Sequence, residues 1–400
     1  MGNAPKLRFE GFTDAWEQRK LGYYFEERSE RRLHEDDELL SVTIADGVIK
    51  QADSDKKNTA SSDTSNYKMV YPGDLAYNSM RMWQGAEGVS KFVGIVSPAY
   101  TVIKPKASID TTFFAFMFKQ ERMLKTFERN SQGLTSDTWN LKFPALSKIT
   151  VSAPLIEEQQ SIVNCLNDID SLITLHQRKC DALTKAKTFY LQNLFPQEGE
   201  KEPKLRLEGF TDSWNQYSLG DLYTERNERG NEMLQILTVS IHTGVSDGAL
   251  EEDELGKSVR RSEDKTLYKH VYVGDLIFNM MRAWQGAIGV AKREGMISPA
   301  YISAIPDERV FPPFMNYLLR RKEIISQINN LSYGVTDFRK RLYWDSFIKV
   351  KCSLPSVEEQ KRITDVFEQL DTLITRQEHR IKALKTMKKF MLQNMFPQEG

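Results

Sequence analysis

The chain has 400 residues, and its basic and acidic side chains are equal in number, so the formal net charge is zero. This length can hold two domains with substantial cores, and the composition is ordinary for a globular protein. Zero net charge excludes a global basic field of the kind that indicates nucleic acid binding, although local patches can still carry such a contact. The longest apolar stretch, Phe113 to Phe118, is far too short to cross a bilayer.

The cysteines and the first residues bear on the compartment. Cys165, Cys180 and Cys352 have neither metal-binding nor disulfide spacing, which is typical of a reducing compartment. The chain shows no secretory signal, and Lys6 stands where a myristoylation site needs Ser or Thr. We therefore expect a cytoplasmic protein.

Much of the first half of the chain returns in the second half. The repeated pairs are Lys6–Trp16 with Lys204–Trp214, Tyr71–Gly85 with Tyr272–Gly286, and Asn193–Gly199 with Asn394–Gly400. This period is far longer than a solenoid unit, so the chain holds two copies of a whole module. Two similar modules can present two similar faces to one long ligand, and duplex DNA is the commonest ligand of that kind.

The offset between the copies changes along the chain. It is 198 at Trp16 and Trp214 and becomes 201 from Tyr71 onward. Each module therefore has a constant frame with a variable segment, at about 47–71 in one copy and 244–272 in the other. Variable segments on a shared frame are usually where binding choice is determined.

The first part of each module is predicted to be mixed β structure. Strands are expected at Val70–Tyr77, broken by a Pro-Gly turn, and as a pair within Val89–Val102. An amphipathic helix is expected next, at Thr112–Phe127 and Pro313–Ile328. A loop then follows at Ser131–Thr135 and Ser332–Thr336, and a last strand at Ile149–Val151 and Ile348–Val350.

Each module then closes with a long predicted helix. Pro154 and Pro355 are followed by acidic residues, a pattern that favours a helix start, and no Pro or Gly follows for about 39 residues, or roughly 58 Å. Apolar residues recur at alternating spacings of four and three, which is typical of a heptad seam. The seam is polar at His176 and Lys187 in one copy and at Gln377 and Lys388 in the other.

A single helix with one apolar stripe is rarely stable alone, so we expect the two helices to pair in an antiparallel way. The predicted fold class is α+β, with two pseudo-symmetric mixed α/β domains separated by a pair of long antiparallel coiled-coil helices. The expected organisation is a first domain at 1–156, a central helix at 157–196, a linker at 197–203, a second domain at 204–357, and a distal helix and tail at 358–400.

Motifs for catalysis are missing. Phe311–Phe314 contains Pro-Pro-Phe but lacks the polar residue that an adenine methyltransferase places before it. No glycine-rich loop is placed to hold a phosphate or a nucleoside cofactor, and the scattered histidines have no ligand spacing. We therefore expect a chain that is not an enzyme and binds no cofactor or metal itself.

Residues that could contact DNA fall into two sets. The set shared by both copies is Arg81, Trp83 and Gln84 with Arg282, Trp284 and Gln285. Arginine is a common partner of phosphate and guanine, and glutamine can pair with adenine. Identical residues cannot give two different specificities, so these either position phosphates or serve the structure, with the tryptophans in the core and the glycines in a turn.

The set that differs between the copies is a better candidate for specificity. It comprises basic and aromatic residues in the variable segments and after the Gly-x-Thr loop: Lys56, Lys57, Trp139, Lys142, Arg260, Arg261, Lys265, Arg339, Lys340 and Arg341. Thr135 and Thr336 of the loop itself, which both copies share, are further candidates for DNA contact. Basic residues interleaved with aromatic ones suit contacts to phosphates and bases. The alternative is a solvated charged loop.

These features together resemble the specificity subunit of type I restriction–modification enzymes over nearly the whole chain. The motifs that carry the resemblance are the pairs Trp16/Trp214, Asp74/Asp275, Pro98/Pro299, Thr135/Thr336 and Gln159/Gln360, in the same order in both copies. The resemblance implies that each module is a target recognition domain and reads one half of a split, asymmetric DNA site. It also implies that the helix pair is a ruler.

The resemblance further implies partner subunits. Two modification subunits, which bind S-adenosylmethionine and methylate adenine, would dock on the helices, and ATP-dependent restriction subunits would join for cleavage. A different class of protein stays open on the sequence alone: a two-headed scaffold that binds protein with both modules and does not contact DNA.

Overall fold

The computed structural model describes residues 5–34, 36–54, 63–106, 108–135, 138–197, 199–231, 233–242, 244–247, 267–335 and 340–397. The chain divides into two compact units. Unit 1 comprises Met1–Gln177 with His379–Gly400, and unit 2 comprises Arg178–Glu378. The long helices α5 (Ile156–Asn193) and α11 (Val357–Asn394) each contribute one part to unit 1 and the other part to unit 2.

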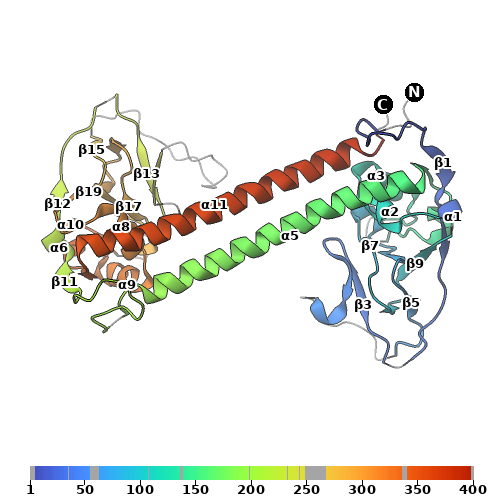
Figure 1. Cartoon of the computed structure of the whole chain (residues 1–400), viewed down its shortest axis with the longest axis horizontal. Helices are drawn as coiled ribbons and strands as arrows, with labels where there is room; N and C mark the ends of the chain where they lie inside the picture. Colours follow the sequence, from blue (N-terminus) through green and yellow to red (C-terminus); the bar gives the residue numbers. More distant parts are fainter. Residues whose placement is uncertain are drawn as a thin grey trace. The chain divides into compact units, whose positions relative to one another are not determined.

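Unit 1 contains an antiparallel sheet in the order β2-β9-β6-β7, of which Figure 1 labels β9 and β7. Its strands are β2 (Phe25–Glu27), β9 (Tyr100–Pro105), β6 (Leu75–Asn78) and β7 (Glu87–Val89). Separate ladders pair β1 (Glu17–Lys20) with β10 (Thr150–Ala153), β3 (Leu40–Thr43) with β4 (Gly47–Lys50), and β5 (Lys68–Val70) with β8 (Gly94–Val96). The predicted Pro-Gly turn lies between β5 and β6, where Gly73 has a φ of +90°, a value that side chains with a Cβ rarely adopt.

The helices of unit 1 are α1 (Leu21–Tyr24), α2 (Thr111–Phe118), α3 (Glu121–Asn130) and α4 (Phe143–Leu146), with short 3₁₀ turns η1 (Gln51–Asp53) and η2 (Met82–Gln84). The single helix predicted over 112–127 is therefore wrong, because α2 ends at Phe118. Gln120 has extended backbone angles, and its side-chain amide donates to the carbonyl of Phe116 at 3.0 Å, which satisfies one of the carbonyls at the end of α2.

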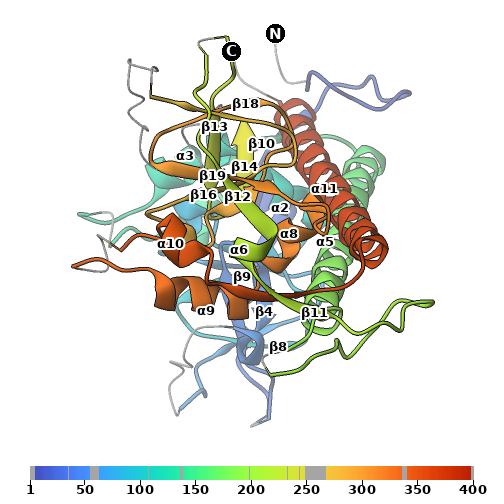
Figure 2. The ribbon, with the colours of Figure 1, turned by 90° about the vertical axis from the view of Figure 1, so that its left-hand side faces the viewer.

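Unit 2 repeats this architecture with the sheet order β12-β19-β16-β17, of which Figure 2 labels β12, β19 and β16. Its strands are β11 (Asn215–Ser218), β12 (Tyr223–Arg226), β13 (Leu237–Ser240), β14 (Gly244–Asp247), β15 (Lys269–Val271), β16 (Leu276–Asn279), β17 (Ile288–Val290), β18 (Gly295–Ile297), β19 (Tyr301–Pro306) and β20 (Lys351–Leu354). Its helices are α6 (Leu219–Leu222), η3 (Ala283–Gln285), α8 (Pro312–Leu318), α9 (Lys322–Leu331) and α10 (Trp344–Phe347).

The helix predicted over 313–328 is also divided, between α8 and α9. The last strand of each domain begins later than predicted, at Thr150 and at Lys351. Ile149 and Val350 instead close the turns after α4 and α10, where their N–H groups donate to the carbonyls of Leu146 and Phe347.

The long helices are confirmed, each with 38 residues, and they pack side by side in an antiparallel way within each unit. In unit 1 the amine of Lys388 on α11 lies 2.6 Å from a carboxylate oxygen of Asp170 on α5. In unit 2 Lys187 on α5 pairs with Asp371 on α11. These lysines are the polar seam residues that the heptad pattern identified, and each is paired with an aspartate of the facing helix.

The chain after each long helix enters the core of a domain. In unit 1 Phe396 packs on the rings of Trp16 and Phe113, at centroid distances of 6.3 and 5.3 Å. In unit 2 Phe195 packs in the same way on Trp214 and Phe314, at 6.1 and 5.3 Å. The repeated Trp and Phe-Pro motifs therefore pack against each other in each unit. We call this contact between the end of a long helix and the core of a unit a joint.

The described residues contain no group of three His, Cys, Asp or Glu side chains arranged to hold a metal ion. Nor does any helix in this part of the chain have the length and apolar character needed to span a membrane.

Candidate nucleic-acid interface

The Arg-x-Trp-Gln-Gly motif forms the same turn in both units. In unit 1, η2 buries Met82, exposes Arg81 and Gln84, and ends at Gly85, whose φ is +82°. The indole N–H of Trp83 donates to the carbonyl of Met80 at 3.1 Å, and the ring is only half-buried. The predicted glycine turn is thus present, while the tryptophan lies at the surface of the core and the arginine faces solvent.

Unit 2 reproduces this geometry around η3. Arg282 and Gln285 are exposed, and the indole N–H of Trp284 donates to the carbonyl of Met281 at 3.0 Å. Gly286 ends the turn with a φ of +101°. The shared set of candidate residues therefore forms a surface turn that is the same in the two units.

The loop after α3 folds into a hairpin that rests on this turn. Gln132 and Asn140 exchange both of their backbone hydrogen bonds, at 3.0 and 2.8 Å. The next residue, Leu141, donates its N–H to the carbonyl of Ser79 at 2.8 Å, which ties the hairpin to the start of the turn. In unit 2 the corresponding bonds join Tyr333 to Arg341, and Leu342 to Met280.

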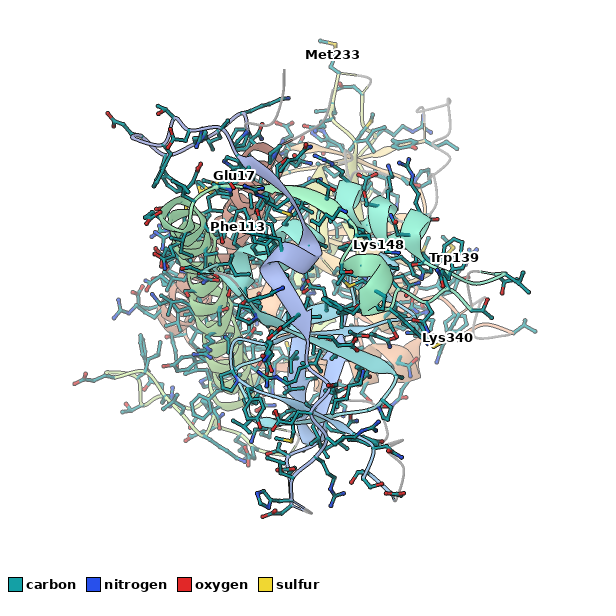
Figure 3. All side chains as sticks on the ribbon, turned by 90° about the vertical axis from the view of Figure 1, so that its right-hand side faces the viewer. Glu17, Phe113, Trp139, Lys148, Met233 and Lys340 are labelled. Atoms are coloured by element: carbon teal, nitrogen blue, oxygen red, sulfur yellow. The ribbon has the colours of Figure 1, made fainter. Side chains whose placement is uncertain are left out.

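Side chains of hairpin and turn meet, and here the two units differ. Trp139 of the hairpin packs edge-on against Trp83, with ring centroids 5.3 Å apart. At the same place in unit 2, Lys340 lies over the ring of Trp284, with its amine 5.9 Å from the centroid. Figure 3 shows Trp139 at the outer edge of unit 1, away from the buried Phe113.

The remaining candidates divide by whether the structure describes them. Thr135, Lys142 and Arg341 are exposed in or just after the hairpins. Lys340 also donates to the side chain of Asn329 at 2.8 Å, so it is held in place. The candidates that lie outside the described residues are Lys56, Lys57, Arg260, Arg261, Lys265, Thr336 and Arg339.

The repeated Gly-Asp motif has a structural role in each unit. Asp74 accepts two hydrogen bonds from the guanidinium of Arg28, at 2.7 and 3.0 Å, and one from the N–H of Tyr71. Arg226 and Asp275 form the same bidentate pair in unit 2. The pair holds the Pro-Gly or Val-Gly turn against β2 or β12, which explains why Gly-Asp recurs.

The Glu-Glu-Gln motif at the start of each long helix is also a joint. Glu158 accepts two hydrogen bonds from Arg8, and this interaction raises the pKa of the guanidinium. Gln159 accepts from the N–H of Asp110, which caps α2 through its side chain, and donates to the carbonyl of Pro154. These pairs explain the repeat of Lys-Leu-Arg at 6–8 and 204–206, because Arg206 binds Glu359 in the same way.

Sequence reasoning had not paired these groups. Arg8 and Glu158 are 150 residues apart, and Arg28 and Asp74 are 46 apart, so spacing gives no indication of contact. The signal that could have identified them is their joint recurrence in both copies, since each member of each pair is repeated.

Comparison with known proteins identifies the class to which these features correspond. Residues 15–185 match the family model described as the type I restriction modification DNA specificity domain. Over 345 residues the chain is 24% identical to the type I restriction enzyme MjaVIII specificity subunit of Methanocaldococcus jannaschii, an alignment that covers 78% of this chain and 76% of that protein.

The fold has also been seen in a solved structure. The crystal structure of the S subunit of a type I restriction-modification system from M. genitalium has a TM-score of 0.60 to this chain, with 14% identity, and covers 99% of this chain and 100% of that one. This likeness confirms the predicted fold class. Residues 15–185 are similar to a DNA specificity domain, and the resemblance to type I specificity subunits inferred from the sequence is confirmed. The DNA-free scaffold is the less favoured alternative.

Proposed function

We propose that each unit reads one half of a split, asymmetric DNA target, and that the chain thereby directs adenine methylation and restriction by partner subunits. The observation that carries this proposal is that Trp139 in the hairpin of unit 1 is replaced by Lys340 in the hairpin of unit 2, while the turns on which the hairpins rest match. Identical frames that present different side chains at one position suit two related half-sites with different base sequences.

The shared and unshared residues then have different tasks. Arg81 and Arg282 are exposed on matching turns and are suited to hold phosphates, which carry no sequence information. The hairpins, with Trp139 and Lys142 in one unit and Lys340 and Arg341 in the other, are suited to contact bases. Neutral total charge is compatible with this arrangement, because only these surfaces need to be basic.

Partner subunits are proposed to bind the long helices. Phe189 and Phe390 occupy the same place in the repeat, and both are more than half exposed. Leu172 and Leu373 form a second exposed pair of this kind. Apolar side chains repeated on both helices suit two copies of one partner. These partners would be modification subunits carrying S-adenosylmethionine, joined by ATP-dependent restriction subunits in the cytoplasm. This chain would bind neither cofactor and would perform no catalysis.

The docking proposal predicts that Phe189→Ser combined with Phe390→Ser reduces the number of modification subunits bound per chain, measured by mass analysis of the purified complex. Leu155→Ser, at another exposed apolar position, is the control and should leave the number unchanged. Full occupancy of the double variant would contradict docking at these residues.

A domain exchange tests the reading of half-sites. Lys20 and Thr150 are register partners in the β1–β10 ladder, so residues 20–150 can be replaced between two adjacent points. Replacement by the same part of another family member should change one half of the methylated sequence, as mapped on a genome that carries the gene with its partners. The matched exchange between Ser218 and Lys351 should change the other half. A change in both halves, or in neither, would contradict the modular assignment.

A further inference from the structure

The tip of each hairpin carries an aliphatic side chain that faces solvent. Leu134 is 101% exposed and Val335 is 90% exposed. The two residues are 201 apart, so they occupy the same place in the repeat. One exposed aliphatic residue is ordinary on a protein surface. The same exposure at the same position of both copies, close to residues 136–140 and 337–341 at which the two sequences differ, indicates a shared use.

The hairpin of unit 1 is built to hold this tip outward. The ladder between Gln132 and Asn140 closes the loop, and Thr138 donates its N–H to the carbonyl of Thr135 at 2.9 Å. Gly133 has a φ of +152°, and a Cβ on it would lie 2.6 Å from the carbonyl atoms of Thr138. Only glycine fits there, so the backbone beside Leu134 is tightly turned.

The surroundings of the tip are cationic. The hairpin rests on the turn that exposes Arg81, and Lys142 is exposed just after the hairpin. In unit 2 Arg282 is exposed on the matching turn, and Arg341 is exposed at the end of the hairpin. A protein partner would favour a continuous apolar patch. Duplex DNA instead offers phosphates to the cations and apolar base surfaces, such as the thymine methyl group or an opened base step, to an aliphatic tip.

We propose that Leu134 and Val335 make apolar contacts to bases, one in each half-site, while Arg81 and Arg282 on the flanking turns contact phosphates. This inference rests on the proposed function and adds a side chain to each reading surface that the basic and aromatic pattern did not select. Apolar contact to a base releases no counterion. The contribution of each tip to affinity is therefore independent of salt, whereas the contribution of the arginines is not.

The test uses the full chain in complex with its modification subunits, with Leu134→Ser and Val335→Ser as variants and Val93→Ser, an exposed valine outside the hairpin, as the matched control. Binding is measured by fluorescence anisotropy over a series of salt concentrations. The probes are a duplex of the mapped target and a scrambled duplex of equal length. Each tip variant should weaken target binding roughly tenfold, in the range expected for loss of one base contact. The slope against salt, binding to the scrambled duplex and the melting temperature should stay the same.

Three results would overturn the inference: unchanged target affinity, equal loss on both duplexes, or a reduced salt slope in the tip variants. Failure of the proposed function itself is distinguishable, because the unmodified complex would then show no preference for the target duplex over the scrambled one.

Discussion

The two units differ in one row of buried side chains. In unit 1, Glu87, Tyr77 and Thr101 are paired across β7, β6 and β9, and all are buried. At the same places in unit 2 stand Ile288, Phe278 and Ile302, also buried. The backbone register is identical, so one frame accepts a polar row and an apolar row. The two units thus share one fold although the polarity of this row differs, so the residues that the units have in common, at the joints and turns, are the ones that specify the fold.

The polar row includes a buried ionisable group, the carboxyl group of Glu87, whose burial is unfavourable. Its carboxylate oxygens have no hydrogen-bond partner among the residues that the structure describes. Burial raises its pKa to about 8, although Lys119 opposes the shift. The carboxyl group is therefore mostly protonated at neutral pH, because a neutral acid is less costly to bury than a carboxylate. Ile288 carries no such cost, so the core of unit 1 is expected to be the more sensitive of the two to pH.

The largest effects are expected at the joints formed by the chain after each long helix. Phe396→Ala should destabilise unit 1 and Phe195→Ala unit 2, each by ~3–5 kcal/mol, the usual cost of removing a buried Phe ring. Phe195 should cost more, because it also stacks on Phe367 at 5.9 Å, where unit 1 has Leu166. Hydrogen exchange read by mass spectrometry can localise each effect. Faster exchange confined to the last turn of α11 in Phe396→Ala would contradict a role for this residue in the core of unit 1.

These joints also show how far the sequence could predict the structure. The long helices and the duplicated module followed from periodicity and repeats, because both are properties of local sequence. The end of α2 did not, because apolar residues continue on both sides of the break, and the same break occurs in unit 2, where Arg321 stands in place of Gln120. The attachment of Phe396 to Trp16 depends on contact between distant segments, and no spacing rule indicates it.

The sequence predicted some residues of the candidate site and missed others. The basic and aromatic pattern identified Arg81, Trp83 and Trp139, and the structure brings the two tryptophans together. It did not identify Leu134, because exposure of an aliphatic residue cannot be read from sequence. Binding by any of these residues stays a prediction.

A pH-dependent effect should follow from exchanging the polar row for its apolar counterpart. In the folded chain Glu87 keeps its proton up to about pH 8, whereas in the unfolded chain it loses the proton near its ordinary pKa of about 4.3. Between these values unfolding releases a proton, so rising pH favours unfolding by up to ~1.4 kcal/mol per pH unit. The contribution of Glu87 to stability is thus complete below about pH 4 and is lost as pH rises through about 8.

Glu87→Ile should remove this slope and stabilise unit 1 at pH 8, whereas Ile288→Glu should introduce a similar slope in unit 2. The measurement is the rate of amide exchange in each unit, corrected for the intrinsic pH dependence of exchange, from pH 5 to 9. Tyr77→Phe is the control, since it makes the row less polar without removing the ionisable carboxyl group. A pH slope in unit 1 that persists in Glu87→Ile would mean that another group titrates there.

The smallest effect is expected where the two units are the same. Arg81→Ala and Arg282→Ala should each weaken binding of the complex by a similar factor on target and scrambled duplexes, and each should reduce the slope of log affinity against log salt by about one. The reason is that matching turns expose both arginines, so each is suited to neutralise one phosphate. Gln84→Ala and Gln285→Ala, at positions three residues after the arginines in the same turns, should leave the salt slope unchanged, because glutamine carries no charge. Relaxed specificity at one base pair in an arginine variant would show instead that this arginine reads a base. The two turns would then have the same backbone but different roles in binding.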